Sequence, residues 1–333
     1  MNEANTTKTR SKRQSWLKKA TPYVILAVVV AILPFFASTY IQGMVIKILI
    51  YSIFALSLNL LWGYTGLFSL GHAAYFGVGG YTAGILIVRF GIDNFWIAAP
   101  AGILIATLLA AILGIPALRV AGAYFLLVTL AMGELIYSIA ERWYSLTGGG
   151  NGLYGIPLPN LHIPGFTMNS LSLYFMVFIV FIICAFLIYR IINSPFGDAL
   201  QGIRENEPRM RALGYNTWLY KYLAFIIGGL FAGVAGVLFG HFTGIIAPVH
   251  VGVMTSTLVM LMIILGGASM VFGPVLGAAV VVLLEQISSI YTPERWPLIL
   301  GAVFVLAVMF LRGGIGIHLQ RLWRILARGS ATG

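Results

Sequence analysis

The sequence predicts an all-α membrane protein with about ten transmembrane helices, and composition, run length and charge distribution carry that prediction. Of 333 residues, 60% are hydrophobic and 9% are charged, with a mean hydropathy of +0.96. Soluble domains have about a quarter of their residues charged, so an ordinary soluble globule is excluded. The uncharged runs are long enough to cross a hydrocarbon core of about 30 Å, which needs roughly 20 residues of helix.

Hydrophobic runs define the expected spans. The first contains Pro34, which is expected to kink it or end it early, because proline cannot donate the helical hydrogen bond. Spans two to five and seven to ten are candidates for two inverted repeats, an arrangement common in transporters. The ten expected spans are 22–38, 41–62, 66–88, 96–117, 123–140, 171–192, 222–242, 251–267, 271–289 and 297–312.

The basic residues predict the orientation, because Lys and Arg remain cytoplasmic when spans insert. A cytoplasmic N-terminus places the tails 1–21 and 313–333, together with a long loop at 193–221, on that side, and 22–312 forms the transmembrane domain. The net charge of +11 then reflects topology and attraction to the lipid bilayer rather than nucleic-acid binding. Sixteen of the twenty basic residues fall on the cytoplasmic side: Lys8, Arg10, Lys12, Arg13, Lys18, Lys19, Arg119, Arg190, Arg204, Arg209, Arg211, Lys221, Arg312, Arg321, Arg324 and Arg328.

Patterns that would indicate catalysis or cofactor binding are missing. Cys184 is the single cysteine, and the two histidines His241 and His250 have no carboxylate or cysteine at ligand spacing, so no metal site is expected. The glycine-rich stretch TGGGNGLYGIPLPN in the outer loop 141–168 is not a phosphate-binding loop, because no Gly-Lys pair follows it. Two interpretations of that loop stay open, a simple connection and a gate or docking surface.

The long loop 193–221 is expected to fold as two short helices. Ser194 followed by Pro195 is a helix start, because serine caps free amides and proline fits the first turn. Asn206 is expected to end the first helix and cap the second, and Gly214 to terminate the second in a left-handed conformation. One face of the first helix carries Phe196, Leu200 and Ile203.

The second helix has Met210 and Leu213 three residues apart, which predicts a small apolar ridge surrounded by charges. A two-turn helix is unstable alone in water, so neighbours must hold it. Such a ridge suits insertion into the groove of a soluble partner. The alternative is that the ridge packs on the protein's own span ends.

Glycine is dense between Gly63 and Gly84, at the junction of the second and third spans. Small residues allow close helix packing, and they also permit a broken backbone that lines a transport path. His72 is either a path residue or a donor to a neighbouring carbonyl. The candidate path residues are Asn59, Gly63, Gly66, Ser69, Gly71, His72, Gly133 and Glu134.

Three charged residues, Lys47, Glu134 and Glu285, fall inside spans. A lone charge at the bilayer centre costs about 2.5 to 3.5 kcal/mol on insertion scales, so each is expected to face a partner or water. Pairing of Lys47 with either acid would remove much of that cost. Alternatively, Glu134 lines the path and meets an ammonium group of the solute.

The loop SPFGDALQGIRENEPRMRALGYN, followed by YKYLAFIIGGLFAGVAGVLFG, resembles the LivM-type permeases of bacterial branched-chain amino acid ABC importers. Four further segments resemble that family in the same order, so the resemblance runs from about Ser52 to Ile315. They are LNLLWGYTGLFSLGHAAYFGVGGYTAG, TGGGNGLYGIP, ILGGASMVFGPVLGAAVVVLLEQ and ERWPLILGAVFVLAVMFLRGGI.

The resemblance implies a transport subunit of the bacterial inner membrane, with no enzymatic activity and no cofactor of its own. It implies a heterodimer with a second, related permease, two cytoplasmic ATPase subunits and a periplasmic substrate-binding protein, with 141–168 on the periplasmic side. The family's ATPase-docking helix corresponds here to 205–214. The residues assigned to ATPase coupling are Gly197, Arg204, Glu205, Asn206, Glu207, Met210, Leu213 and Gly214.

Two other transport functions remain open. An ion-coupled secondary transporter would need carboxylates or broken helices near the midplane, and the chain has few such acids. Permeases of this kind also carry urea, amides or aromatic acids, and the spans do not identify the solute. A membrane enzyme would need a paired acid and nucleophile or a metal cluster, and no such pattern is present.

Overall fold

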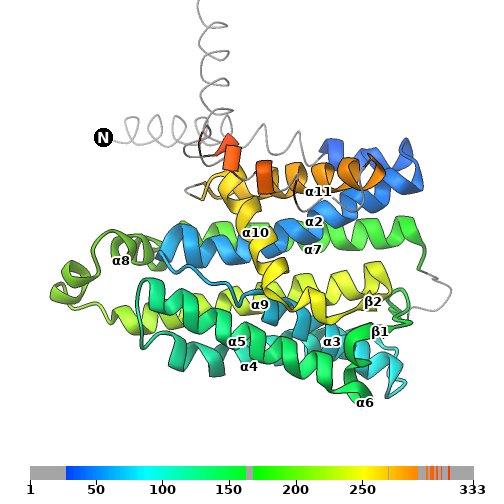
Figure 1. Cartoon of the computed structure of the whole chain (residues 1–333). Helices are drawn as coiled ribbons and strands as arrows, with labels where there is room; N and C mark the ends of the chain where they lie inside the picture. Colours follow the sequence, from blue (N-terminus) through cyan, green and yellow to red (C-terminus); the bar gives the residue numbers. More distant parts are fainter. Residues whose placement is uncertain are drawn as a thin grey trace, which may run out of the picture.

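The computed structural model describes residues 28–162, 168–268 and 270–291, and the separate positions 298, 301–303, 305–306, 309, 314 and 315. These residues form long helices that lie side by side (Figure 1). Within the described ranges, six helices are long and apolar enough to cross a membrane, and two apolar helices are shorter. The prediction of an all-α polytopic membrane protein is therefore confirmed.

The elements follow one another along the chain with short connections. The long helices are α2 (Thr39–Asn59), α3 (Ala73–Val88), α4 (Phe95–Ala117), α5 (Ala123–Arg142), α7 (Ser170–Ile192), α8 (Pro195–Ala212), α9 (Thr217–Thr243), α10 (Val253–Gly266) and α11 (Gly273–Tyr291). The short elements are η1 (Leu33–Phe35), the π-helical turn η2 (Leu60–Tyr64), α6 (Tyr144–Thr147), η3 (Gly149–Asn151), β1 (Leu153–Tyr154), β2 (Ile245–Ile246) and η4 (Pro248–His250).

Eight of the ten expected spans coincide with described helices, namely α2 to α5, α7 and α9 to α11. Of the first expected span, residues 28–32 are helical and pass into η1, which contains Pro34, so the early end expected at this proline is confirmed. The tail 1–21, most of the span 297–312 and most of the tail 313–333 lie outside the described residues.

The third expected span, 66–88, is helical only from Ala73, so the start placed at residue 66 is wrong. Two features of the backbone explain the difference. Gly66 has a φ of +77°, a left-handed conformation that ends the preceding helix. The Leu67 N–H then donates back to the Leu61 carbonyl at 3.0 Å, and the chain runs irregularly through 65–72 before α3 begins.

Helices α2 and α9 form the centre of the fold. In the most hydrophobic stretch of each, 78% and 72% of the residues are buried, against 22% in α5. Helix α2 packs against α7, α9 and α11, while α9 packs against α3 and α4. A Cβ at Gly236 of α9 would lie 1.8 Å from the carbonyl oxygen of Phe76, so only glycine permits this approach of α9 to α3.

The two ends of the bundle differ in structure. Helix α8 projects from one end, while α6, β1 and β2 lie at the other (Figure 1). At that second end the outer loop is tied to the connection after α9. Leu153 pairs with Ile246, the N–H groups of Gly155 and Ile156 both donate to the Gly244 carbonyl, and His241 Nδ1 bonds to the Pro157 carbonyl at 2.9 Å.

Candidate functional site

The first half of α8 packs against the rest of the protein through buried residues. The Ser194 hydroxyl accepts a hydrogen bond from the Gly197 N–H, and Pro195 occupies the first turn, so the predicted helix start is confirmed. Gly197 is buried against the end of α7, where a Cβ would lie 2.0 Å from the Ile192 carbonyl oxygen. Leu200 and Ile203 are buried, as expected of the apolar face of this helix.

A kink at Asn206 divides α8 into two helices. Its φ of −158° and ψ of 90° are not helical, and its side chain accepts a hydrogen bond from the Arg209 N–H at 3.0 Å. Gly214 follows the second helix with a φ of +89°, and the Tyr215 N–H returns to the Met210 carbonyl. The predicted pair of capped helices is therefore confirmed.

Glu207 holds the second half of α8 against α9. Its carboxylate accepts hydrogen bonds from Arg211 at 2.6 Å, from the Thr217 hydroxyl at 3.0 Å and from Lys221. Partial burial alone would raise the pKa of Glu207, but the bonds from Lys221 and Arg211 outweigh that effect and lower it. The carboxylate is therefore ionised at neutral pH, and the short helix has the neighbours that it needs.

The expected ridge of Met210 and Leu213 is not a single exposed surface, so this prediction is wrong in its geometry. The kink turns Met210 back onto the first half, where its sulfur lies 2.8 Å from the position that a Cβ on Gly202 would occupy. Leu213, in contrast, is 65% exposed. Glu205 is also exposed, at the end of the first half. Leu213 is thus the apolar residue of the pair that α8 presents to its surroundings.

Arg204 is also exposed, but its side chain lies against η2. Its guanidinium donates a hydrogen bond to the Gly63 carbonyl at the end of η2. Its Cγ lies 3.2 Å from the position of a Cβ on Gly66, so the side-chain stem covers that glycine. Arg204 therefore joins the predicted coupling residues to the predicted path residues.

The path candidates around 59–72 include buried polar atoms that are short of partners. The Asn59 amide donates to the Met270 carbonyl at 3.2 Å, but Asn59 Oδ1, Ser69 Oγ and His72 Nδ1 have no hydrogen-bond partner among the described residues. Buried polar atoms are normally paired with protein or water. The three atoms are therefore positions at which water or a solute group would be stabilised.

The hydrogen bonds of Ser57 assign the proton of the His72 ring to Nε2. The Ser57 hydroxyl donates to the Phe54 carbonyl at 2.6 Å, so it accepts from His72 Nε2, which lies 2.9 Å away. The His72 ring also stacks on Phe54, with ring centroids 5.6 Å apart. His72 thus donates to a hydroxyl rather than to the expected carbonyl, and its role in the path stays a prediction.

Close backbone contacts fix the segment 65–72 from two sides. A Cβ on Gly63 would lie 2.2 Å from the Ala268 carbonyl oxygen, and one on Gly71 would lie 2.1 Å from that of Thr129. A Cβ on Gly133 of α5 would lie 2.9 Å from Gly71 Cα. The structure thus shows close packing at these glycines. It also shows, in the same segment, the broken backbone that was predicted as the alternative to close packing.

The charged residues inside the spans separate into a pair and a single acid. Lys47 Nζ lies 2.8 Å from Glu285 Oε1, which decides between the two partners considered for this lysine. Glu134, on α5, has no ion pair among the described residues. It is one helical turn from Ser138 and two turns from Arg142, so the three form a polar column on α5.

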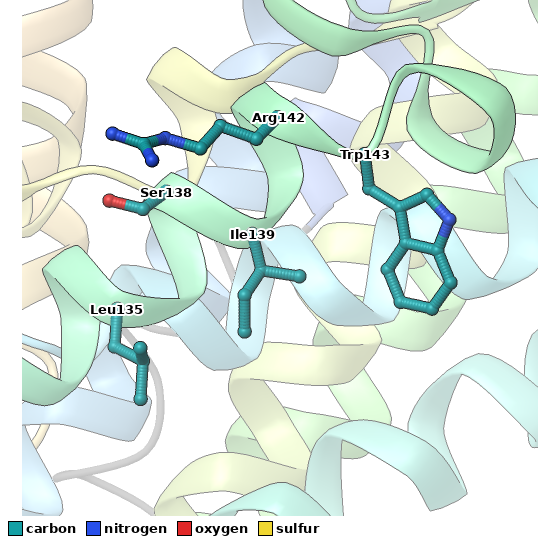
Figure 2. Close-up of a pocket in the computed structure, with 5 residues that line it drawn as sticks. All are labelled: Leu135, Ser138, Ile139, Arg142 and Trp143. Carbon is teal, nitrogen blue, oxygen red and sulfur yellow. The ribbon is translucent and has the colours of Figure 1, made fainter.

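A shallow hollow lies along this outer side of α5 (Figure 2). Figure 2 shows the Ser138 hydroxyl and the Arg142 guanidinium directed to the same side of the helix, with Leu135, Ile139 and Trp143 completing the lining. A helix facing lipid alone would be uniformly apolar, so this column indicates contact with water or another protein.

Sequence reasoning missed Ser57, Thr129, Ser138 and Arg142 as parts of these sites. The signal that would have found the first three is a polar residue inside an otherwise apolar span. The contact of Arg204 with Gly63 had no local signal, because it joins residues 141 positions apart.

Several apolar helices long enough to cross a membrane, with buried polar atoms between them, are typical of membrane transport proteins. The chain belongs to the family described as the permease component of the branched-chain amino acid transport system, whose model matches residues 40–311. The resemblance inferred from the loop and span motifs is therefore confirmed.

Individual relatives agree with the family. The high-affinity branched-chain amino acid transport system permease protein LivM of Escherichia coli is 29% identical over 96% of this chain and 80% of its own length. The probable LivM of Methanocaldococcus jannaschii is 29% identical over 73% of this chain and 79% of its own. The permease LivH of Escherichia coli is 26% identical over 80% and 90%. No solved structure matches the chain.

Proposed function

We propose that this chain is one of two permease subunits of an ATP-driven importer, and that it forms half of the path for branched-chain amino acids across a bacterial inner membrane. The observation that carries the proposal is α8. A secondary transporter has no need of a polar helix that is braced by Glu207 and yet presents Leu213 to solvent, whereas a permease moved by a separate ATPase needs such a contact.

The distribution of charge supports a cytoplasmic position for α8. Among the described residues, six basic side chains belong to α8 or to the helix ends beside it, and Arg89 and Arg142 lie at the opposite end. Positive residues favour the cytoplasm. Both tails are then cytoplasmic, the chain has ten spans, and 141–168 faces the periplasmic binding protein. The six residues are Arg119, Arg190, Arg204, Arg209, Arg211 and Lys221.

Helix packing supports two inverted halves. Helices α2 and α9 run in opposite directions through the centre, since the end of α2 and the start of α9 both lie at the α8 end (Figure 1). Helix α2 packs on α10 and α11, and α9 packs on α3 and α4. Each central helix thus contacts the outer helices of the other half, as expected for repeats related by a two-fold axis in the membrane plane.

The partners follow from the relatives. Because the chain is similar to both LivM and LivH, we infer a dimer of two related permeases, one ATPase on each coupling helix and a binding protein outside. The polar column of α5 would face the second permease across the path. Glu134 is then available to the ammonium group of an amino acid, with Arg142 two turns away for its carboxylate.

The proposal is tested by reconstituting the chain with a second permease, the ATPases and the binding protein in proteoliposomes. Uptake of leucine, isoleucine or valine should require ATP and be indifferent to proton and sodium gradients. Leu213→Asp should abolish uptake and weaken ATPase binding, while Leu213→Met, which keeps an apolar side chain, should retain both. Uptake by this chain alone, driven by an ion gradient, would overturn the proposal, and ATP-driven uptake of urea or amides in place of these amino acids would overturn its substrate.

A further inference from the structure

Arg204 binds the end of one of the two central helices, at the point where that helix breaks. Helix α2 and η2 together run from Thr39 to Tyr64, and the carbonyl groups at such an end carry partial negative charge and lack helical partners. Within the described part of the chain, the donor that reaches the Gly63 carbonyl is the Arg204 guanidinium. The same side chain covers Gly66, the left-handed residue at which the irregular segment starts.

The position of Arg204 within α8 is next to a hinge. Leu200 and Ile203 fix the first half of the helix in the core, and the kink at Asn206 separates it from the half that presents Leu213. If the second half of α8 moves, the helix bends at Asn206, two residues from Arg204. The guanidinium is therefore the side chain of α8 through which bending at the kink reaches the end of α2.

From there the contacts continue to α5 without a gap. The Leu70 N–H donates to the Thr129 hydroxyl at 3.3 Å, and a Cβ on Gly71 would lie 2.1 Å from the Thr129 carbonyl oxygen. A Cβ on Gly133 would lie 2.9 Å from Gly71 Cα. Close-packed interiors shift as units rather than compress, so movement of 65–72 is passed to α5 and to Glu134, the residue after Gly133.

We propose that Arg204 is a positioning residue that transmits the movement of α8 to the segment 65–72 and through it to α5, which sets the geometry of the transport path. This role differs from contact with the ATPase, to which the sequence alone had assigned Arg204. The inference rests on the proposed function, because it takes α8 as the element that the ATPase moves.

The first experiment compares three variants in the complete transporter, reconstituted with its ATPases and binding protein. Arg204→Gln should leave ATP hydrolysis and assembly intact but lower the solute imported per ATP about tenfold, as expected for loss of one charged hydrogen bond. Arg204→Lys, which keeps a cation, should recover part of the ratio. Arg119→Gln is the matched control, since Arg119 is exposed at the same end and, among the described residues, has no side-chain hydrogen bond to the segment 65–72.

A second measurement follows movement directly in the same complexes. In the wild-type transporter, hydrogen–deuterium exchange in 60–72 and in 205–221 should change between nucleotide-free and ATP-bound states. In Arg204→Gln only the change in 205–221 should remain. A purely structural role for Arg204 would alter exchange in both states equally and would not uncouple the two segments.

The outcomes separate the two proposals. If the wild-type complex shows no ATP-driven uptake, the proposed function fails. If the wild type transports while Arg204→Gln keeps the ratio of solute to ATP, or loses ATPase binding altogether, the role of Arg204 proposed here is wrong. Should Arg204→Gln fail to assemble, the comparison of Arg204→Lys with the wild type decides, because a normal ratio and normal exchange at 60–72 without the guanidinium would also refute it.

Discussion

Replacing Lys47 with methionine is expected to destabilise the folded chain by about 3 kcal/mol, because Glu285 would remain between α2 and α11 without its cation. The Nζ–Oε1 distance is 2.8 Å, and each side chain is 24% exposed. The other oxygen, Glu285 Oε2, is buried and has no partner among the described residues. Removing one member of a buried pair costs about 3 to 5 kcal/mol, and partial exposure places this pair at the lower end.

The assay is thermal unfolding of the purified chain in lipid nanodiscs at one fixed scan rate, since unfolding of such proteins is often irreversible. A loss of this size corresponds to a fall in Tm of roughly 5 to 10 °C. The double variant Lys47→Met with Glu285→Leu removes both charges and should return Tm to within about 3 °C of the wild type, because a buried pair adds little over apolar residues of similar volume.

The reasoning would be refuted by a double variant as unstable as Lys47→Met alone. That result would mean that the loss comes from packing around α2 rather than from an uncompensated charge. A Tm unchanged by Lys47→Met would equally refute it, by showing that water reaches Glu285.

Three further predictions concern the segment 65–72 and α8. Gly71→Ala should cost about 1 to 3 kcal/mol, because its Cβ would lie 2.1 Å from the Thr129 carbonyl oxygen; an unchanged Tm would show that the segment yields. Since the pKa of Glu207 is lowered in the fold, its network should stabilise the α8–α9 junction fully above about pH 4.5, its ordinary value, and lose that contribution as the pH falls further; Glu207→Gln should remove this pH dependence of Tm. Met210→Ala should speed hydrogen exchange in α8 by loosening its contact with Gly202, whereas Leu213→Ala should not, and equal effects would contradict the different burial of the two side chains.

The features that could be predicted from the sequence are those with a local cause. Hydropathy located eight described helices, because a membrane span must be apolar along its whole length. Capping residues predicted both halves of α8, since the bonds of Ser194 and Asn206 are made within three residues in the chain. The left-handed conformation of Gly214 was predicted in the same way, because glycine commonly ends a helix in that conformation.

The features that escaped prediction depend on contacts between distant segments. Hydropathy treats 66–72 as part of a span, but its conformation is set by Gly71 against Thr129 of α5 and by Arg204 on Gly63. The choice of Glu285 over Glu134 as the partner of Lys47 depends on the packing of α11 against α2. The spacing of Met210 and Leu213 predicted one exposed ridge, but the kink at Asn206 folds Met210 back onto Gly202 and leaves Leu213 exposed.

The pairing of β1 with β2 limits how the chain can open. Antiparallel strands that are hydrogen-bonded through their backbones cannot slide past one another without breaking those bonds. The outer loop at 153–156 therefore remains bound to the connection at 244–246. Because this pairing holds the bundle together at one end, neighbouring helices can move further apart at the α8 end than at the β1–β2 end. We therefore expect the helices of this protein to separate less at the β1–β2 end than at the α8 end when its conformation changes.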